Sequence, residues 1–146
     1  MHPGAIEQAI SSHPDVAEAC VVGIPDAMKG HLPFAFVAVS NDTQSSPDKL
    51  FPEIQKIVRE QIGAIASLGG MIQGKGMIPK TRSGKTLRRV LRELIENAVH
   101  GEFDKDVQIP TTIEDREPVN VARQKVKEYF KDKEGRHKSI ETRSKI

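Results

Sequence analysis

The sequence predicts a small α+β domain in which helices flank a short central sheet. Two near-continuous apolar runs, residues 17–24 and 33–40, are bounded by glycines and prolines, which is typical of strands covered on both faces. Residues 85–98 carry apolar side chains at the helical period, the best helix pattern in the chain. Helical patterns also precede and follow the apolar runs, so we expect helices to pack around the sheet.

The first predicted helix covers residues 3–12. It places Ile6, Ala9 and Ile10 on one face and ends before Pro14. The two strands follow, and residues 41–47 form a polar loop after them.

A second helix is predicted from Ser46-Pro47-Asp48, which combines an N-cap residue, a first-turn proline and a first-turn acid. It should end at Gly63 and bury the apolar residues Leu50, Ile54, Ile57, Val58 and Ile62. Residues 68–78 predict a third strand, which is expected to be bulged or poorly formed because it contains Gly69, Gly70, Gly74 and Gly76.

The C-terminal part predicts one strong helix, a connector and a last helix. The strong helix begins at Lys85, and residues 101–118 contain two prolines and no period, which indicates a connector on the surface. The last helix has the apolar positions Val119, Ala122, Val126, Tyr129 and Phe130. We therefore divide the chain into a domain of residues 1–100, a connector with helix at 101–131 and a disordered tail at 132–146.

Composition restricts compartment and partners. The 146 residues have a formal net charge of +2, too small to imply a polyanionic partner. Cys20 is the single cysteine and is expected to be a buried hydrophobe, and the five histidines are expected at the surface, without metal-ligand spacing. No signal pattern or membrane span is present, so we expect an intracellular protein of the cytosol or mitochondrion, with no membrane association. The last three residues, Ser144-Lys145-Ile146, resemble the peroxisomal targeting signal SKL but end in isoleucine instead of leucine.

Six cations fall within residues 80–92, namely Lys80, Arg82, Lys85, Arg88, Arg89 and Arg92. Such a basic run can bind nucleic acid, but this one favours that function little, because no aromatic side chains lie among the cations to stack on bases. Arg89 and Arg92 each have a glutamate four residues on, which predicts a solvated helix face for the three arginines of this run at 88–92.

Lys85 ends the run PKTRSGK of residues 79–85, where a proline and a glycine shape a turn and present one cation. Ser83-Gly84-Lys85-Thr86 looks like the end of a P-loop, but that motif needs a glycine where Pro79 stands. Proline has no N–H to offer a phosphate, so the P-loop and dinucleotide interpretations both fail.

Three strings together resemble the C-terminal domain of the AMP-forming acyl-CoA synthetases, of the adenylate-forming superfamily. VAEACVVGIPD at 16–26 and GHLPFAFV at 30–37 are similar to two strands of that family, and PKTRSGK at 79–85 is similar to its last signature motif. PTTIED at 110–115 resembles the ending of the acetyl- and propionyl-CoA synthetase branch. The resemblance implies a three-layer-like lid domain with a mainly antiparallel sheet.

The resemblance also implies a reaction: an acid and ATP give an acyl-adenylate and pyrophosphate, and CoA then displaces AMP. Lys85 corresponds to the lysine that enters the site for adenylation. Arg59, in VREQIG at 58–63, corresponds to an arginine near the CoA 3′-phosphate, with a helix-surface ion pair as the alternative. The loop-shaping residues are Pro79, Thr81, Arg82, Ser83 and Gly84.

The departures from the family concern what surrounds these motifs. The large N-terminal domain and the hinge aspartate have no counterpart in the chain, and residues 69–78 differ from the family's apolar strand. We therefore expect the chain alone to be inactive and to bind no cofactor. A partner domain would supply the sites for ATP, Mg²⁺, CoA and a small carboxylic acid. The alternative is a non-catalytic binding or regulatory module that docks on another protein through an exposed apolar patch.

Overall fold

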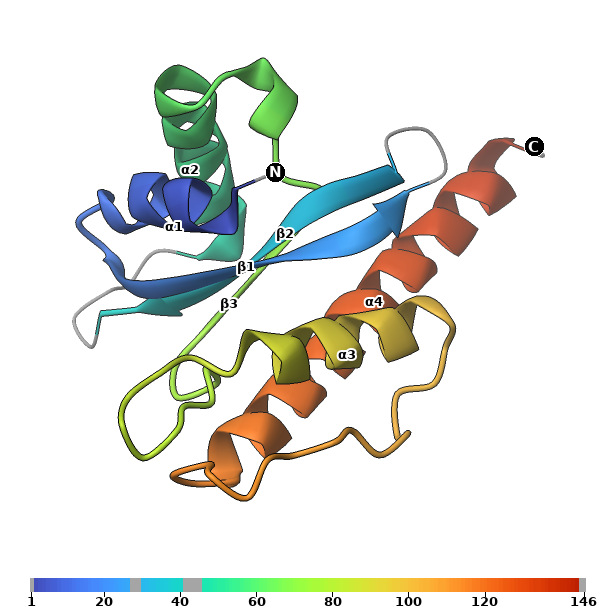
Figure 1. Cartoon of the computed structure of the whole chain (residues 1–146). Coiled ribbons are helices and arrows are strands. Elements are labelled where there is room, and N and C mark those ends of the chain that lie inside the picture. Colours follow the sequence, from blue (N-terminus) through green and yellow to red (C-terminus); the bar gives the residue numbers. More distant parts are fainter. Residues whose placement is uncertain (1, 27–29, 41–45, 145–146) are drawn as a thin grey trace.

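The protein forms three layers in the computed structural model, which describes residues 2–26, 30–40 and 46–144. Helices α1 and α2 cover one face of the sheet, and α3 and α4 cover the other (Figure 1). The elements in chain order are α1 Pro3–Ser11, β1 Val16–Asp26, β2 Gly30–Val39, α2 Pro47–Gln61, a 3₁₀ turn Ala64–Ala66, β3 Gly70–Gly74, α3 Arg88–Val99 and α4 Glu117–Ser144. The predicted α+β class with helices on both faces is confirmed.

The sheet is mixed, with the order β1-β2-β3. Strands β1 and β2 pair antiparallel over most of their length, with Cys20 opposite Phe36. The short β3 pairs parallel with β2, with Ile72 opposite Phe36. The chain crosses from β2 to β3 through α2, and such a crossover makes the two strands parallel. The longer pair in the sheet is thus antiparallel, as expected, and the shorter pair is parallel.

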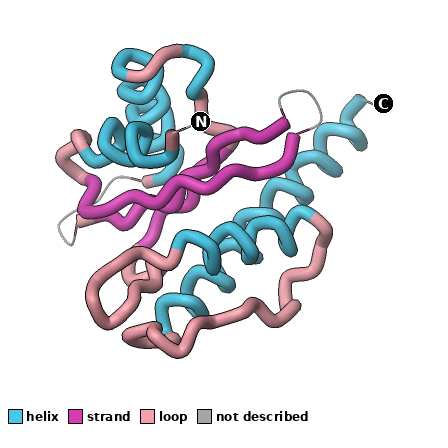
Figure 2. Tube along the Cα trace, viewed as in Figure 1, coloured by secondary structure: helices cyan, strands magenta, loops and turns pink. Residues whose placement is uncertain are grey.

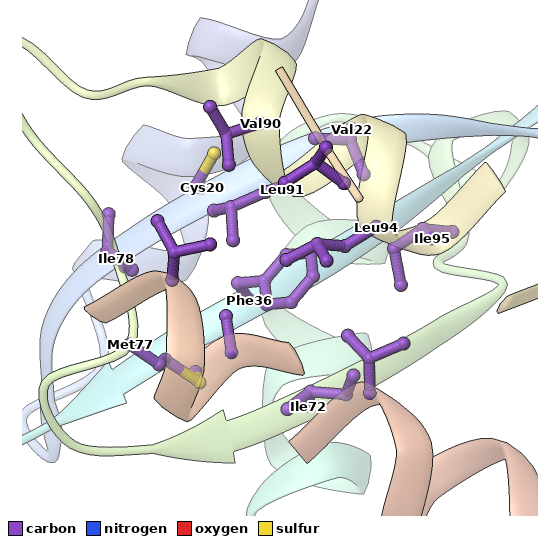
Figure 3. Close-up of a cluster of buried hydrophobic side chains, with 14 of the residues drawn as sticks. Cys20, Val22, Phe36, Ile72, Met77, Ile78, Val90, Leu91, Leu94 and Ile95 are labelled. Carbon is purple, nitrogen blue, oxygen red and sulfur yellow. The ribbon is translucent and has the colours of Figure 1, made fainter. Parts of the chain in front are cut away.

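Alternate strand residues separate into two buried clusters, one on each face of the sheet. Cys20 and Phe36 face α3 and α4, whereas their neighbours Val21 and Val37 face α1 and α2. Figure 3 shows the first cluster, in which side chains of α3 lie over the strands. This two-sided burial explains why both long strands are near-continuous apolar runs.

Gly70 opens β3 at a position where a side chain would not fit. A Cβ atom there would lie 2.6 Å from Cε2 of Phe34 and would collide with the hydroxyl of Tyr129. Helix α4 therefore packs closely on this strand because residue 70 is a glycine. The predicted weak strand is confirmed, since β3 spans only Gly70–Gly74 of the expected 68–78.

Helix α3 begins at Arg88 and not at Lys85 as predicted. The three preceding residues are held outside the helix because Thr86 pairs with Lys80 in a backbone bridge. The apolar period of residues 87–98 is nevertheless correct, since Val90, Leu91, Leu94, Ile95 and Ala98 are all buried.

The prediction of a surface connector is wrong in part. Val107 and Ile113 lie in the segment between α3 and α4, and both are buried in the core cluster of α3 and α4. The two helices leave apolar surface that these side chains cover, which no period in the sequence indicates. In Figure 2 the connector crosses beneath α3 as a long loop.

Two further expectations need correction. Ile62 is 42% exposed and not buried, because α2 ends at Gln61 before its last apolar position reaches the core. Helix α4 continues to Ser144, past the expected end at Lys131, and this part of the sequence is rich in lysine, arginine and glutamate, which favour helix. Residues 41–45 of the predicted loop and residues 145–146 of the peroxisome-like ending lie outside the described residues. In the described part of the chain, no helix combines the length and the apolar character needed to cross a membrane.

Candidate functional site: the Lys85 hairpin

Residues 79–86 form a tight hairpin, here called the Lys85 hairpin. The N–H of Thr81 donates to the carbonyl of Lys85 at 2.9 Å, and Lys80 pairs with Thr86 in an antiparallel bridge. At the tip, the N–H of Gly84 donates to the carbonyl of Thr81 at 2.8 Å. Gly84 has φ +89°, a backbone conformation that L side chains rarely adopt, so glycine is suited to this turn.

Side chains of the motif brace the same turn. The hydroxyl of Thr81 lies 3.0 Å from the hydroxyl of Ser83 and accepts a hydrogen bond from the N–H of Lys85 at 3.1 Å. At the base, Pro79 is buried and its carbonyl accepts from Leu87 at 2.9 Å. These contacts agree with the shaping role expected for Pro79, Thr81, Ser83 and Gly84.

Lys85 itself is exposed at the end of the hairpin. Within the residues that the structure describes, no ion pair or side-chain hydrogen bond engages its ammonium group. Arg82 is also exposed, although its backbone N–H is engaged. The hairpin therefore offers a cation to a negatively charged group outside the domain.

The hairpin is attached to the domain on two sides. The N–H of Arg82 donates to the carbonyl of Thr112 at 3.1 Å, and Thr81 forms a bridge with Ile113. On the other side, the ammonium of Lys80 lies 2.8 Å from a carboxylate oxygen of Glu18 in β1. Sequence reasoning missed Glu18 and the connector, because both are remote from the motif along the chain.

The basic run after the hairpin is partly neutralised. Arg88 is exposed as predicted, but its partner lies on another helix, since its Nη2 is 2.7 Å from both carboxylate oxygens of Glu7 in α1. This hydrogen bond raises the pKa of Arg88 above its ordinary value. The predicted pair of Arg92 with Glu96 is present at 3.9 Å, whereas Arg89 donates to Gln108 at 2.7 Å.

A shallow hollow of about 600 Å³ between α1, β1 and α3 is lined in part by Arg88, Arg89 and Arg92. Because Arg88 and Arg92 are each paired with a glutamate, this face is less basic than the sequence suggests. It does not favour the nucleic-acid alternative, which requires free cations along a phosphate backbone.

Arg59 and the hairpin lie on opposite sides of the sheet. Arg59 is an exposed residue in the last turn of α2, on the face of the sheet opposite α3 and α4. The structure therefore does not bring Arg59 and Lys85 into one site. Figure 1 shows α2, which carries Arg59, on the opposite face of the sheet from α3, which follows the hairpin.

Among the histidines, His13 is 8% exposed, so its expected place at the surface is wrong. Its Nδ1 accepts from the N–H of Asp15 at 3.0 Å, and its Nε2 lies 2.7 Å from a carboxylate oxygen of Glu53. The ring is thus a structural link between the end of α1 and α2. No group of three or more His, Cys, Asp and Glu side chains in the described part of the chain could hold a metal ion.

The profile of one protein family, described as the AMP-binding enzyme C-terminal domain, matches residues 5–85. That match ends on Lys85 and includes all of the hairpin up to it. The chain belongs to this family.

Relatives of this AMP-binding C-terminal domain agree with the assignment. An acetyl-coenzyme A synthetase of Pyrobaculum aerophilum is 41% identical over 123 residues, 84% of this chain. A match of that length in a chain of 146 residues must include residues 112–114 of the connector, whichever end of the chain it leaves out. The crystal structure of a Brucella canis acyl-CoA synthetase covers 62% of the chain at 35% identity with a TM-score of 0.58. The acetoacetyl-CoA synthetase of Streptomyces lividans shares the fold over 88% of the chain, with a TM-score of 0.69 at 18% identity.

The chain spans only a small share of these proteins. It covers 17% of the length of the Pyrobaculum enzyme, 16% of the Brucella chain and 18% of the Streptomyces chain. In its relatives, this domain is therefore one part of a much longer synthetase.

Proposed function

We propose that this domain is the lid of an AMP-forming short-chain acyl-CoA synthetase and that Lys85 is its adenylation lysine. The observation that carries the proposal is the Lys85 hairpin, which holds an exposed lysine, without an ion-pair partner among the described residues, at the end of a braced turn. Family membership and the 41% identity to an acetyl-coenzyme A synthetase support the reaction class and the short-chain acid.

The chemistry requires a cation that arrives from outside the nucleotide site. In the first step, a carboxylate oxygen bonds to the α-phosphorus of ATP and pyrophosphate leaves. In the second step, the sulfur of CoA bonds to the acyl carbon, AMP leaves and the thiol proton goes to solvent. Lys85 would act in the first step by neutralising negative charge as two anions approach, a role in which a lid completes the site.

The remaining groups would come from the large domain of such a synthetase. ATP, CoA and the acid are substrates, and we assign the Mg²⁺ that accompanies ATP to that domain, because the described residues of this one contain no cluster suited to a metal. This chain's own contribution is the positioned cation on one face and Arg59 on the other.

A chimera tests the proposal: this domain replaces the corresponding domain of the Pyrobaculum acetyl-CoA synthetase. The two half-reactions are measured separately, adenylation by ATP–pyrophosphate exchange and thioester formation from added acyl-adenylate. Lys85→Ala should slow adenylation about 10²- to 10³-fold and leave thioester formation unchanged. Lys131→Ala, which removes another exposed lysine on the α3 and α4 side, is the matched control and should leave both rates unchanged.

An equal loss in both half-reactions of the Lys85→Ala chimera would contradict the assigned role. A chimera that folds but supports neither half-reaction would contradict the lid function and would favour the binding-module alternative.

A further inference from the structure

We propose that residues 112–114 of the connector, here called the clamp segment, position the Lys85 hairpin for adenylation. The inference rests on the proposed function and deepens it, because it assigns a positioning role to residues beyond the match to the family profile. The backbone of the clamp segment contacts the hairpin directly.

The clamp segment lies along the first arm of the hairpin as an additional strand. The carbonyl of Thr112 accepts from the N–H of Arg82 at 3.1 Å, and the N–H of Glu114 donates to the carbonyl of Lys80 at 2.9 Å. Between these two bonds, Ile113 forms an antiparallel bridge with Thr81. The pairing is reciprocal, as in a short antiparallel ladder.

A third strand matters here because a two-stranded hairpin in water is marginally stable on its own. The tip of the Lys85 hairpin is exposed from Arg82 to Lys85, and the ammonium group of Lys85 has no hydrogen-bond or ion-pair partner among the residues that the structure describes. Without the clamp segment, the first arm would keep its bonds to the second arm and the Lys80–Glu18 ion pair, which is partly exposed. An ion pair that remains partly open to solvent stabilises only modestly.

The clamp segment is itself anchored in the core. Ile113 is 7% exposed and packs in the same buried cluster as Val119 of α4 and Leu91 of α3. Its N–H also donates to the carbonyl of Pro110 at 3.2 Å, which makes a turn of the connector. The position of the Lys85 hairpin is therefore tied to the packing of α3 against α4, and a shift of the connector would move the lysine.

Two substitutions of Glu114 distinguish the contribution of its backbone hydrogen bond from that of its side chain. Glu114→Pro removes the N–H that donates to Lys80, whereas Glu114→Ala keeps that N–H and removes only an exposed side chain. In the isolated chain, Glu114→Pro should speed amide hydrogen exchange of Arg82 by about tenfold, and Glu114→Ala should leave it unchanged. The exchange of core amides in β2 reports whether the domain remains folded.

In the chimeric synthetase, Glu114→Pro should lower the rate of adenylation and leave thioester formation from added acyl-adenylate unchanged, with Glu114→Ala at the parent rate for both. A clamp that served only general stability would lower both half-reactions together. Equal Arg82 exchange in the two variants, or an equal loss in both half-reactions, would overturn the proposal.

A second variant applies if Glu114→Pro does not fold. Arg82→Pro removes the N–H that donates to Thr112, the other hydrogen bond of the clamp segment. Proline is suited to this position because the preceding residue, Thr81, is extended and because residue 82 is the second residue of the turn from Thr81 to Gly84. Arg82→Pro should speed exchange of the Glu114 amide by about tenfold relative to Arg82→Ala. Because exchange is measured in this chain alone, an inactive chimera would count against the proposed function without altering the outcome for the clamp.

Discussion

Cys20 lies on β1 with none of its surface exposed, in the cluster between the sheet and α3. Burial, followed by the negative charge of nearby Glu7, raises the pKa of its thiol from 9.0 to about 12. A neutral thiol in an apolar cluster behaves as a small hydrophobe. The prediction from its position within an apolar run is confirmed.

The raised pKa of Cys20 predicts how stability changes at high pH. The folded state favours the protonated thiol, so this contribution is fully present below the unfolded pKa of 9.0 and is lost as the pH rises toward about 12. Between these values, the free energy of unfolding should fall by up to about 1.4 kcal/mol per pH unit because of this group. Urea unfolding at pH 8 and pH 10.5 should therefore show a smaller decrease for Cys20→Ala than for the parent, whereas parallel decreases would contradict the assignment.

Glu7 connects three elements of the fold. It lies on α1, accepts a hydrogen bond at 2.7 Å from the N–H of Val21 in the edge strand β1, and pairs with Arg88 at the start of α3. An edge strand otherwise leaves such N–H groups unpaired. The Glu7 carboxylate thus covers part of the free edge of the sheet and ties α3 to α1 across it.

Removing this carboxylate should destabilise the domain more than removing an exposed ion pair. Glu7→Ala leaves the N–H of the fully buried Val21 without a partner and should lower the free energy of unfolding by about 1–3 kcal/mol. The control Arg92→Ala breaks the exposed pair with Glu96 and should change it by less than about 0.5 kcal/mol. Chemical denaturation of both variants provides the measurement, and equal losses would show that the contact of Glu7 with the edge strand is unimportant.

At the scale of the whole molecule, the sheet lies between two sides of the domain, and each side carries a different predicted site residue. The Lys85 hairpin belongs to the side of α3 and α4, and Arg59 belongs to α2 on the other side. A lid that presents one face for adenylation and another for thioester formation would use these residues in different steps. The separation supports that two-step proposal.

The corresponding prediction concerns Arg59 in the chimeric synthetase. Arg59→Ala should raise the KM for CoA about tenfold or more, since a guanidinium suits phosphate oxygens, and should leave the adenylation rate unchanged. Lys49→Ala, which removes another exposed cation of α2, is the matched control and should keep the KM for CoA of the parent. A loss of adenylation in Arg59→Ala, or an unchanged KM, would favour the interpretation of Arg59 as a helix-surface residue.

The sequence by itself determined the local elements and the family. The apolar runs of β1 and β2, the helical period of α3 and the turn residues of PKTRSGK are properties of neighbouring residues, so they can be recognised along the chain. For the same reason, the PKTRSGK motif alone predicts Lys85 as a site residue and indicates the residues that shape its turn.

Only the tertiary structure decided which residues far apart in the sequence come into contact, including those that hold the Lys85 hairpin in place. The pair of Glu7 with Arg88 joins residues 81 positions apart, and the parallel pairing of β3 depends on the path of α2. The clamp segment is the clearest case, because its bonds to Lys80 and Arg82 use backbone N–H and C=O groups. Every residue carries a C=O group and every residue except proline an N–H, so such contacts leave no pattern in the sequence and appear only when the chain is folded.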